Sequence, residues 1–529
     1  MENNYEHIPQ EQFAFAQLDD VIHDKKLETK ARGYFADAFL RFKKNKSSLV
    51  AAWIIGFLVL FAIVSPILSP YDVQHKDTTY TNFAPYVPAI AELELGFLDG
   101  GVVLEQAQDQ LHKWKAIGIE TGMDPVIKYL GTKTVTSKYR GQLVTEEYQR
   151  LKINKYFGTG IIHISSMPYE EFANIQKFQD ETGIQVFYPY VDYNKLIDPA
   201  LLEADTSGNL AETIKRFPID NPNVWYQVKD AKGTPALDAN GNYIPAYATN
   251  ASQAGAEYTS SRVAGDDGSY VYSQAKSGSV AVRVCYYNYY IYKNGHAPSY
   301  LFGTNVLGQD LFCAIGVGAR FSLIFAILVS AINLTIGAVY GAIEGYYGGA
   351  VDMVMERISD VLSGIPTIVV VTLFQLHLAP KYGAVPSFLY AFIMTGWIGM
   401  ASLTRKQFYR FKGQEFVLAA RTLGASDRRL MFKHVFPNSL GTIITSCALV
   451  IPGVISSETT LTYLGIINLS EMVGTSIGVL MSQGQTAMTS SPHAMFFPAL
   501  FVSLLLISFN LFGNGLRDAF NPSTRGSED

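Results

Sequence analysis

One carboxylate stands inside an apolar part of the chain. Glu458 occurs in VISSETTLTYLG and is the only charged residue of the run Thr442–Ile466. Burying a charge in lipid is costly unless it is paired, so such a residue is a candidate functional site. Ser457, Thr459 and Thr460 could add hydroxyl groups to a polar path across the membrane. The alternative is a structural pair, or a position near the outer boundary of the membrane.

Pro366 is a further candidate for such a path. It lies in the apolar run Ile358–Leu378, where a proline can kink a helix and open a cavity. Gln375 and His377 are placed near the outer end of the same run.

The sequence predicts no catalytic site. It has no G-x-x-x-x-G-K-[ST] loop to hold a nucleotide phosphate. Histidines such as His163 and His296 are scattered, so no metal site is expected. No nucleophile–base pair or pair of carboxylates stands out, and the chain is not expected to be an enzyme or to bind nucleic acid. Only Cys285 of the three cysteines falls in a soluble outer region, so no intrachain disulfide is expected there.

The apolar residues, 48% of the chain, gather in six long runs. Each run is long enough for a helix across a hydrocarbon core of about 30 Å. The first is no signal peptide, because a long polar segment precedes it and SPILSP is no cleavage site. The expected spans are Leu49–Leu68, Phe321–Ile343, Ile358–Leu378, Val385–Leu403, Thr442–Ile466 and Met495–Leu516.

Basic residues set the expected orientation. Lysines and arginines cluster just before the first span and again between the fourth and fifth spans. Such clusters favour the cytoplasmic side, and six spans place both termini on one side. We therefore expect a multi-pass plasma-membrane protein with cytoplasmic termini.

Five segments follow from these patterns. Residues 1–48 form a cytoplasmic tail that ends in an amphipathic helix on the membrane surface, with Phe35, Phe39 and Phe42 on one face; a helix packed on the protein is the alternative. Residues 49–70 are the first span and 71–299 an α+β extracellular insertion. Residues 300–523 form a core with five spans and a cytoplasmic loop at 405–438, and 524–529 are a cytoplasmic tail.

Local signals predict the elements of the insertion. TKTVTSKYRGQLVTEEYQRLKI indicates two strands and a turn, and SMPYEEFANIQKFQDETG a helix between proline and glycine. Asn240-Gly241 is typical of a hairpin, and the stretch from Gly265 to Tyr292 alternates like paired strands. The many tyrosines favour sheet packing and a surface near the headgroups; an aromatic peptide-binding platform is the alternative.

Glycines repeat every fourth residue at the end of the second span. Gly337, Gly341, Gly345 and Gly349 would share one helical face. Small residues let two helices approach closely in lipid. The pattern predicts helix packing, either within this chain or against a second membrane subunit.

The polar stretch EFVLAARTLGASDRRLMFKHVFPN forms the loop between the fourth and fifth spans. Glu415–Thr422 is rich in helix formers and carries its acid at the helix start. Gly424 can adopt positive φ and end that helix. Ser426 or Asp427 can cap a second helix, which is expected to stop before Pro437. We call Glu415–Asn438 the knuckle; its alternative reading is a basic loop that only sets orientation.

The knuckle resembles the coupling loop of ATP-binding-cassette importer permeases. That pattern is Glu-x-x-x-Ala-Ala, a glycine four residues beyond, and a proline after the second helix. Glu415, Ala419, Ala420, Gly424 and Pro437 occupy those places. Arg421, Ala425, Ser426 and Asp427 lie among them and belong to the expected contact set with the ATPase.

Further stretches resemble the oligopeptide/dipeptide subfamily of these permeases. They are LFGTNVLGQDLFCAIGVGARFSL, GYYGGAVDMVMERISDVLSGIPTIVV and NLFGNGLRDAFNPS. The resemblance covers about Tyr300–Ser523 and, more weakly, Arg32–Pro70. Gln309 departs from it, because an arginine is common there, and many members lack the large insertion.

The resemblance implies an all-α polytopic fold of six transmembrane helices, the type I importer permease fold, with an inserted α+β domain. It implies a permease subunit of an oligopeptide importer, with dipeptides or nickel chelates as alternative cargo. Expected partners are a second homologous permease, two ATPases that carry ATP and Mg, an extracellular lipid-anchored peptide-binding protein, and membrane lipid. No cofactor is expected in this chain, and the source is expected to be a Gram-positive-like bacterium.

Two other classes compete with this hypothesis. A membrane-anchored receptor or sensor would use the insertion to bind a ligand and the basic loop to signal. An ion-driven carrier would need several intramembrane charges and two related halves, and only Glu458 meets the first condition.

Overall fold

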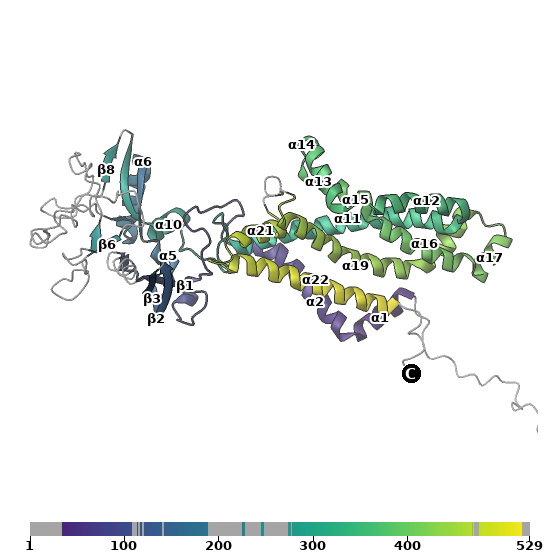
Figure 1. The fold of residues 1–529 in the computed structure, drawn as a ribbon, viewed down its shortest axis with the longest axis horizontal. Coiled ribbons are helices and arrows are strands. Elements are labelled where there is room, and N and C mark those ends of the chain that lie inside the picture. Colours follow the sequence, from purple (N-terminus) through teal and green to yellow (C-terminus); the bar gives the residue numbers. More distant parts are fainter. Residues whose placement is uncertain are drawn as a thin grey trace, which may run out of the picture.

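The computed structural model describes residues 34–107, 121–139, 142–188, 278–467, 469 and 475–520, with the short pieces 114, 117–118, 225–227, 245–247 and 273–276. Long helices run side by side over most of an elongated molecule, and the strands gather at one end (Figure 1). Helix α17 (Glu415–Thr422) of the knuckle lies at the opposite end.

Among the described residues, five helical stretches are long and apolar enough to cross a membrane, and a bent pair makes a sixth if counted as one span. The five correspond to expected spans. They are α2 (Lys46–Leu68), α11 (Leu311–Tyr347), α15 with α16 (Ala384–Gly396 and Ile398–Lys412), the stretch Asp427–Tyr463 that ends in α19 (Phe436–Tyr463), and α22 (His493–Phe520).

Helix α11 begins ten residues before the apolar run that predicted it, at Leu311 instead of Phe321. Asp310 caps it by accepting hydrogen bonds from the backbone N–H groups of Phe312 and Cys313, each at 3.2 Å. At about 1.5 Å per residue, its 37 residues exceed the thickness of a hydrocarbon core. The helix therefore extends beyond the membrane.

The third expected span is a broken one. Helix α12 (Gly349–Ser363) ends near Gly364, and α13 (Thr367–His377) starts directly after Pro366, bent by 73°. The sequence predicted only a kink at Pro366. The break is larger, because the missing N–H and fixed φ of the proline start a new helix. The short helix α14 (Ala379–Tyr382) then leads to α15.

Three of the four glycines of the predicted face lie against another helix of this chain. Ideal Cβ atoms on Gly337 and Gly345 would lie 2.6 Å from the backbone oxygens of Trp397 and Arg405 on α16 or just before it. The Cβ position of Gly341 is even closer to the backbone of α16, at Ala401. Gly349 is outside the face: it starts α12 with φ +59°, and nothing lies within 4 Å of its Cβ position.

Helix α1 (Tyr34–Lys44) is amphipathic, as predicted, but its apolar residues divide between two surroundings. Phe42 is buried and meets Phe512 of α22 edge to face, with ring centroids 5.2 Å apart. Phe39 is 58% exposed. The helix therefore packs on the protein through one side and leaves the other free for lipid.

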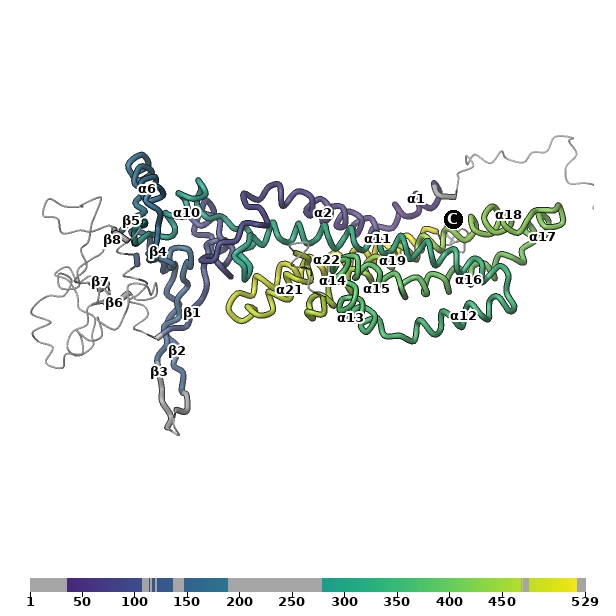
Figure 2. The backbone as a smooth tube through the Cα atoms, turned by 90° about the horizontal axis from the view of Figure 1, so that it is seen from above, coloured from purple at the N-terminus to yellow at the C-terminus, as the bar shows by residue number. Residues whose placement is uncertain are grey.

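A short helix that the sequence did not predict, α21 (Ile477–Thr486), packs against α19 and α22. Its approach is close, because an ideal Cβ on Gly478 would lie 2.8 Å from the backbone oxygen of Thr459. Figure 2 shows α21 at the end of the helical part that faces the insertion.

The insertion holds both strands and helices, as predicted. One sheet has the order β1-β3-β2 and a second has β4-β9-β5, with β8 on β9 and every described pairing antiparallel; β6 pairs with β7. The strands are β1 (Gly101–Ala107), β2 (Val126–Tyr139), β3 (Gln142–Asn154), β4 (Ile161–Pro168), β5 (Phe187–Tyr188), β6 (Trp225–Gln227), β7 (Pro245–Tyr247), β8 (Ser273–Lys276) and β9 (Ser279–Cys285). The helices are α3 (Pro88–Ala91), α5 (Lys155–Gly158), α6 (Tyr169–Thr182) and α10 (Tyr286–Asn294).

Two local predictions for the insertion are confirmed and one is wrong. Helix α6 starts after Pro168 and ends at Gly183, which has φ +73°. The β2–β3 pair matches the predicted strands and turn. Tyr286–Tyr292, the last part of the stretch predicted as strand, belongs to helix α10 (Tyr286–Asn294). The hairpin expected at Asn240-Gly241 lies outside the described residues.

A tyrosine cluster joins the insertion to the helices, and we call it the neck: Tyr71, Tyr80, Tyr86, Tyr156, Tyr290 and Tyr300. Tyr71 stacks on Tyr300 at 4.6 Å, and the backbones of Tyr86 and Tyr300 exchange hydrogen bonds of 2.8 and 2.7 Å. Burial raises the pKa of Tyr80 and of Tyr156 well above that of a free tyrosine, so the neck stays uncharged.

Polar contacts fasten the neck to the start of α11. The buried amide of Gln309 donates to the backbone oxygen of Val73 at 2.6 Å, and the Ser69 hydroxyl donates to Asp310 at 2.7 Å. Gly308, with φ +71°, lies so close to the Asp77 backbone that no side chain fits. The insertion is therefore packed onto the helices rather than attached by a loose linker.

Candidate coupling surface and buried carboxylate

The first half of the knuckle has the predicted shape. Helix α17 (Glu415–Thr422) carries Glu415 in its first turn, and Gly424 follows with φ +82°. The Gly424 N–H donates to the Arg421 oxygen at 3.0 Å, which closes the turn. A non-glycine residue would be strained at this φ.

The second half differs from the prediction. Helix α18 (Asp427–Arg429) starts after Ser426, whose side chain makes no capping hydrogen bond. It continues through a π-helical segment (Leu430–Val435) into α19, so the helix does not stop before Pro437. Pro437 is the second residue of α19, where the hydrogen-bond register changes from π to α. Its missing N–H is tolerated there, because such a change leaves a carbonyl unpaired in any case.

Most predicted contact residues of the knuckle are exposed. This set comprises Glu415, Ala419, Arg421, Gly424, Ser426, Asp427 and Pro437, whereas Ala420 and Ala425 are half-buried. Leu423, which no sequence pattern indicated, is 88% exposed at the tip beside Gly424. Phe416 and Phe432 are also exposed. Exposed apolar side chains ringed by basic ones are typical of a docking surface.

A small hydrophobic core holds the knuckle on the ends of α11 and α16. Val417 of α17 and Leu430 and Val435 of the second half are buried against Phe408 of α16 and Tyr346 of α11. This packing attaches the knuckle to the ends of both long helices.

An ionic cluster joins three helices near the knuckle. Arg405 of α16 binds both oxygens of Asp352, at 2.6 and 2.8 Å, and both oxygens of Glu356, at 2.9 and 3.1 Å. Glu344 of α11 lies 3.5 Å away and is only 3% exposed. Tyr409 donates to Asp352 at 2.6 Å. This bidentate geometry fixes α12 and α11 to α16.

Glu458 is fully buried where α19 faces α11. Ser322 of α11 donates to its Oε2 at 2.8 Å, and the Thr462 hydroxyl lies 3.4 Å from its Oε1. Thr459 is 3.4 Å from Oε2. The carboxyl group is therefore surrounded by hydroxyl donors, and this arrangement can hold two helices together.

The predicted path residues differ in their exposure. Ser457 is half-buried, Thr459 is buried and Thr460 is exposed, as expected for consecutive positions on a helix. Pro366 is exposed at the break between α12 and α13. In the part of the chain described, no group of three or more metal-ligating side chains is found.

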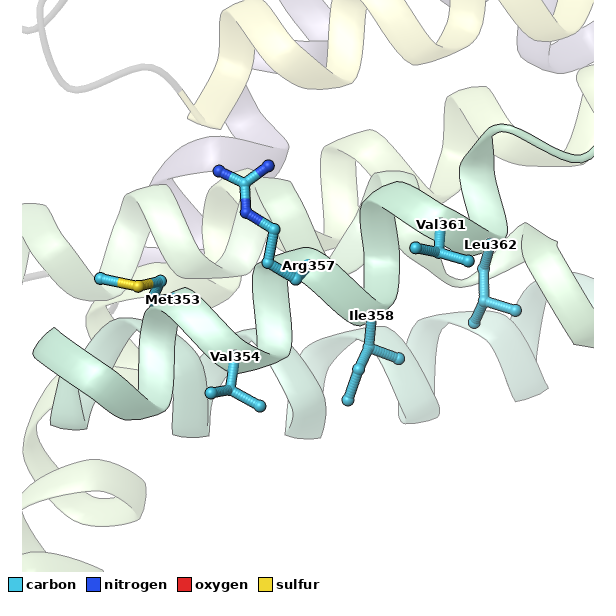
Figure 3. Close-up of a pocket in the computed structure, with 6 residues that line it drawn as sticks. All are labelled: Met353, Val354, Arg357, Ile358, Val361 and Leu362. Atoms are coloured by element: carbon cyan, nitrogen blue, oxygen red, sulfur yellow. The ribbon is translucent and has the colours of Figure 1, made fainter.

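Helix α12 presents an apolar surface with one arginine. Figure 3 shows a shallow surface hollow formed by side chains of α12 alone: Met353, Val354, Arg357, Ile358, Val361 and Leu362. Arg357 pairs with Asp360 at 3.1 Å, and both side chains are exposed. This surface is suited to lipid or to another membrane helix.

These features define a multi-pass membrane protein with a compact helical loop that exposes apolar and basic side chains. Residues 333–526 match the family described as binding-protein-dependent transport system inner membrane component, and residues 33–85 match the N-terminal TM domain of oligopeptide transport permease C.

Similar proteins carry related names. The oligopeptide transport system permease protein OppC of Bacillus subtilis (strain 168) is 40% identical over 42% of this chain and 72% of its own length. The dipeptide transport system permease protein DppC of the same strain is 38% identical over 42% of this chain and 69% of its own length. A solved chain of the MetNI methionine ABC transporter in inward-facing conformations aligns over 39% of this chain and 96% of that chain, at 12% identity and a TM-score of 0.33.

The chain belongs to the oligopeptide/dipeptide family of ABC transporter permeases. This assignment rests on the sequence relatives and not on the alignment with the methionine transporter. The predicted family is thereby confirmed. The protein is a membrane-spanning permease subunit.

Proposed function

We propose that this permease subunit forms half of the translocation path of an ATP-driven importer of oligopeptides. Separate ATPase chains carry ATP and Mg and dock on the knuckle. The observation that carries the proposal is the knuckle itself: Glu415, Ala419 and Gly424 are exposed at one end of the molecule, and the insertion occupies the other. A second homologous permease completes the path.

The two ends suit opposite sides of a membrane. In the proposed orientation both termini and the knuckle are cytoplasmic, and residues 71–299 are extracellular, where a lipid-anchored binding protein delivers the peptide. A Gram-positive-like envelope would suit this arrangement. ATP-driven closure of the ATPases acts by differential affinity for the two conformations of the helices.

Dipeptides are the second candidate cargo. The oligopeptide and dipeptide relatives from one organism are almost equally similar to this chain, at 40% and 38% identity. A transport assay with peptides of two to eight residues, roughly the span between these classes, would separate them by the ratio of kcat/KM values.

Reversing the charge of Glu415 tests the coupling proposal. In proteoliposomes holding the complete complex, Glu415→Arg is expected to lower peptide uptake at least about tenfold while ATP hydrolysis persists, because an arginine opposes the positive end of α17 and alters the docked face. Glu170→Arg is the matched control, since Glu170 is exposed in the first turn of α6.

The turn of the knuckle gives a second variant of this experiment. Gly424→Pro removes the N–H bonded to Arg421 and cannot adopt φ +82°, so uptake should again separate from hydrolysis. Gly183→Pro makes the same change at φ +73° after α6. Normal uptake by both knuckle variants would exclude the proposal; loss only in the α6 variants would favour a sensor role for the insertion.

Glu458 was predicted to lie on the path, but its hydroxyl partners favour a structural role between α11 and α19. We expect Glu458→Ala to lower stability by about 3 kcal/mol, because it empties a buried site and leaves the Ser322 hydroxyl without its acceptor. Glu458→Gln keeps the volume and an acceptor oxygen, so melting and uptake should stay near the wild type. Loss of uptake in Glu458→Gln with unchanged melting would instead place the carboxyl group on the path.

A further inference from the structure

One hydroxyl group touches both halves of the knuckle. Tyr346, in the last turn of α11, is 6% exposed and donates to Asp427 Oδ1 at 2.6 Å. It also accepts a hydrogen bond from Arg421 Nη2 at 3.2 Å. Arg421 belongs to α17 and Asp427 begins α18. The Tyr346 hydroxyl therefore bridges the turn at Gly424.

The base of this tyrosine is held firmly. Lys412 of α16 donates to the backbone oxygens of Gly345 and Tyr346, at 2.8 and 3.3 Å. The Tyr346 ring packs in the knuckle core with Phe408 and Leu430. The last turn of α11 cannot shift without moving either α16 or the knuckle.

We propose that Tyr346 is the positioning residue that carries displacement of the knuckle into α11. This inference rests on the proposed coupling role of the knuckle. A hydrogen bond from a hydroxyl group to a carboxylate is short and strong, and here it links an element that docks with a helix that runs unbroken for 37 residues. Because α11 starts at the neck, motion at Tyr346 also reaches the base of the insertion.

The competing explanation is that the hydrophobic core alone transmits the motion. The two explanations differ in what the hydroxyl group does. Without it, the ring still fills the core, but Arg421 and Asp427, both exposed, are free to bond with water. The two halves of the knuckle can then move without α11.

The test compares Tyr346→Phe with Tyr347→Phe in the complete complex in proteoliposomes. Tyr347, the neighbouring tyrosine, is 55% exposed. Its change to phenylalanine also removes one hydroxyl group and is therefore the control. We expect Tyr346→Phe to lower peptide uptake per ATP hydrolysed about tenfold, the worth of one hydrogen bond to a charged group, with complex yield and ATPase rate retained. Tyr347→Phe should match the wild type. A wild-type uptake-to-hydrolysis ratio in Tyr346→Phe would overturn the inference.

Asp427 supplies a second test if Tyr346→Phe assembles poorly. Asp427→Asn keeps the acceptor oxygen and should keep most of the coupling, whereas Asp427→Ala should lose it. The double variant Tyr346→Phe/Asp427→Ala should be no worse than either single variant, because each removes the same bond. Normal coupling in Asp427→Ala, or additive losses in the double variant, would overturn the inference.

Glu415→Arg in the same assay separates the two ways to fail. If Glu415→Arg and Gly424→Pro both transport normally, the coupling role of the knuckle is wrong and the inference fails with it. If Glu415→Arg uncouples transport and Tyr346→Phe does not, only the role of Tyr346 is wrong.

Discussion

Gly341→Ala is expected to prevent normal folding of the permease. The added methyl group would overlap the backbone oxygen of Ala401 and lie 2.9 Å from its carbonyl carbon. Both sides of this contact are backbone, so no side chain can rotate away. Helices α11 and α16 would have to separate, at a cost of about 3 kcal/mol or more. The measurement is the yield and apparent melting temperature of the monodisperse protein in detergent.

Gly453→Ala is the matched control for this prediction. Gly453 lies inside α19, and nothing is within 4 Å of its Cβ position. Alanine is the better helix former by about 1 kcal/mol, so this variant should fold at least as well as the wild type. Equal yields and melting temperatures for the two variants would mean that the helices are not in contact at Gly341.

Some patterns in the sequence depend only on neighbouring residues. Gly424 had to end a helix, and the spacing of Gly337, Gly341 and Gly345 had to produce a close helix contact. The sequence could not say which helix would be the partner. That depends on the placement of α16, about 60 residues away, which sequence periodicity does not specify.

Pro437 and Tyr286–Asn294 show where local rules fail. A proline after a polar loop is typical of a helix end. Here the π-helical segment before Pro437 already leaves one carbonyl without a donor, so the missing N–H of the proline does not end the helix. Aromatic residues favour strands, yet α10 forms because Tyr289 and Tyr290 are both buried and Gly295 ends the helix at φ +73°. Tertiary packing overrides β-propensity here.

Tyr346 left no signal in the sequence. Its bond to Asp427 joins residues 81 positions apart, and the tyrosine sits beside a second tyrosine and two glycines. Only the packing of α11 against the knuckle decides that the hydroxyl group of Tyr346, and not that of Tyr347, contacts Asp427. The same holds for Arg405, which the sequence showed only as one basic residue among many.

Arg405→Met is expected to be the most damaging single change of a charge in the described part of the chain. Arg405 is 21% exposed and faces Asp352, Glu356 and the nearly buried Glu344. Methionine fills much of the space but leaves three carboxylates close together with no cation between them. The cluster is only partly buried, so breaking it in this way should cost about 3 kcal/mol, the lower end of the range for a buried ion pair. We expect a large fall in apparent melting temperature, with α12 the first helix to detach.

Two further variants decide whether charge is the cause. Lys406→Met, one position along α16, removes an exposed cation and should melt like the wild type. Adding Glu344→Gln and Asp352→Asn to Arg405→Met should recover most of the loss, because neutral amides do not repel one another and Tyr409 can still donate to an amide oxygen. If the triple variant melts no higher than Arg405→Met, the arginine acts through its packing and hydrogen bonds and not through its charge. If Arg405→Met melts like Lys406→Met, the ionic cluster does not hold α12 to α16.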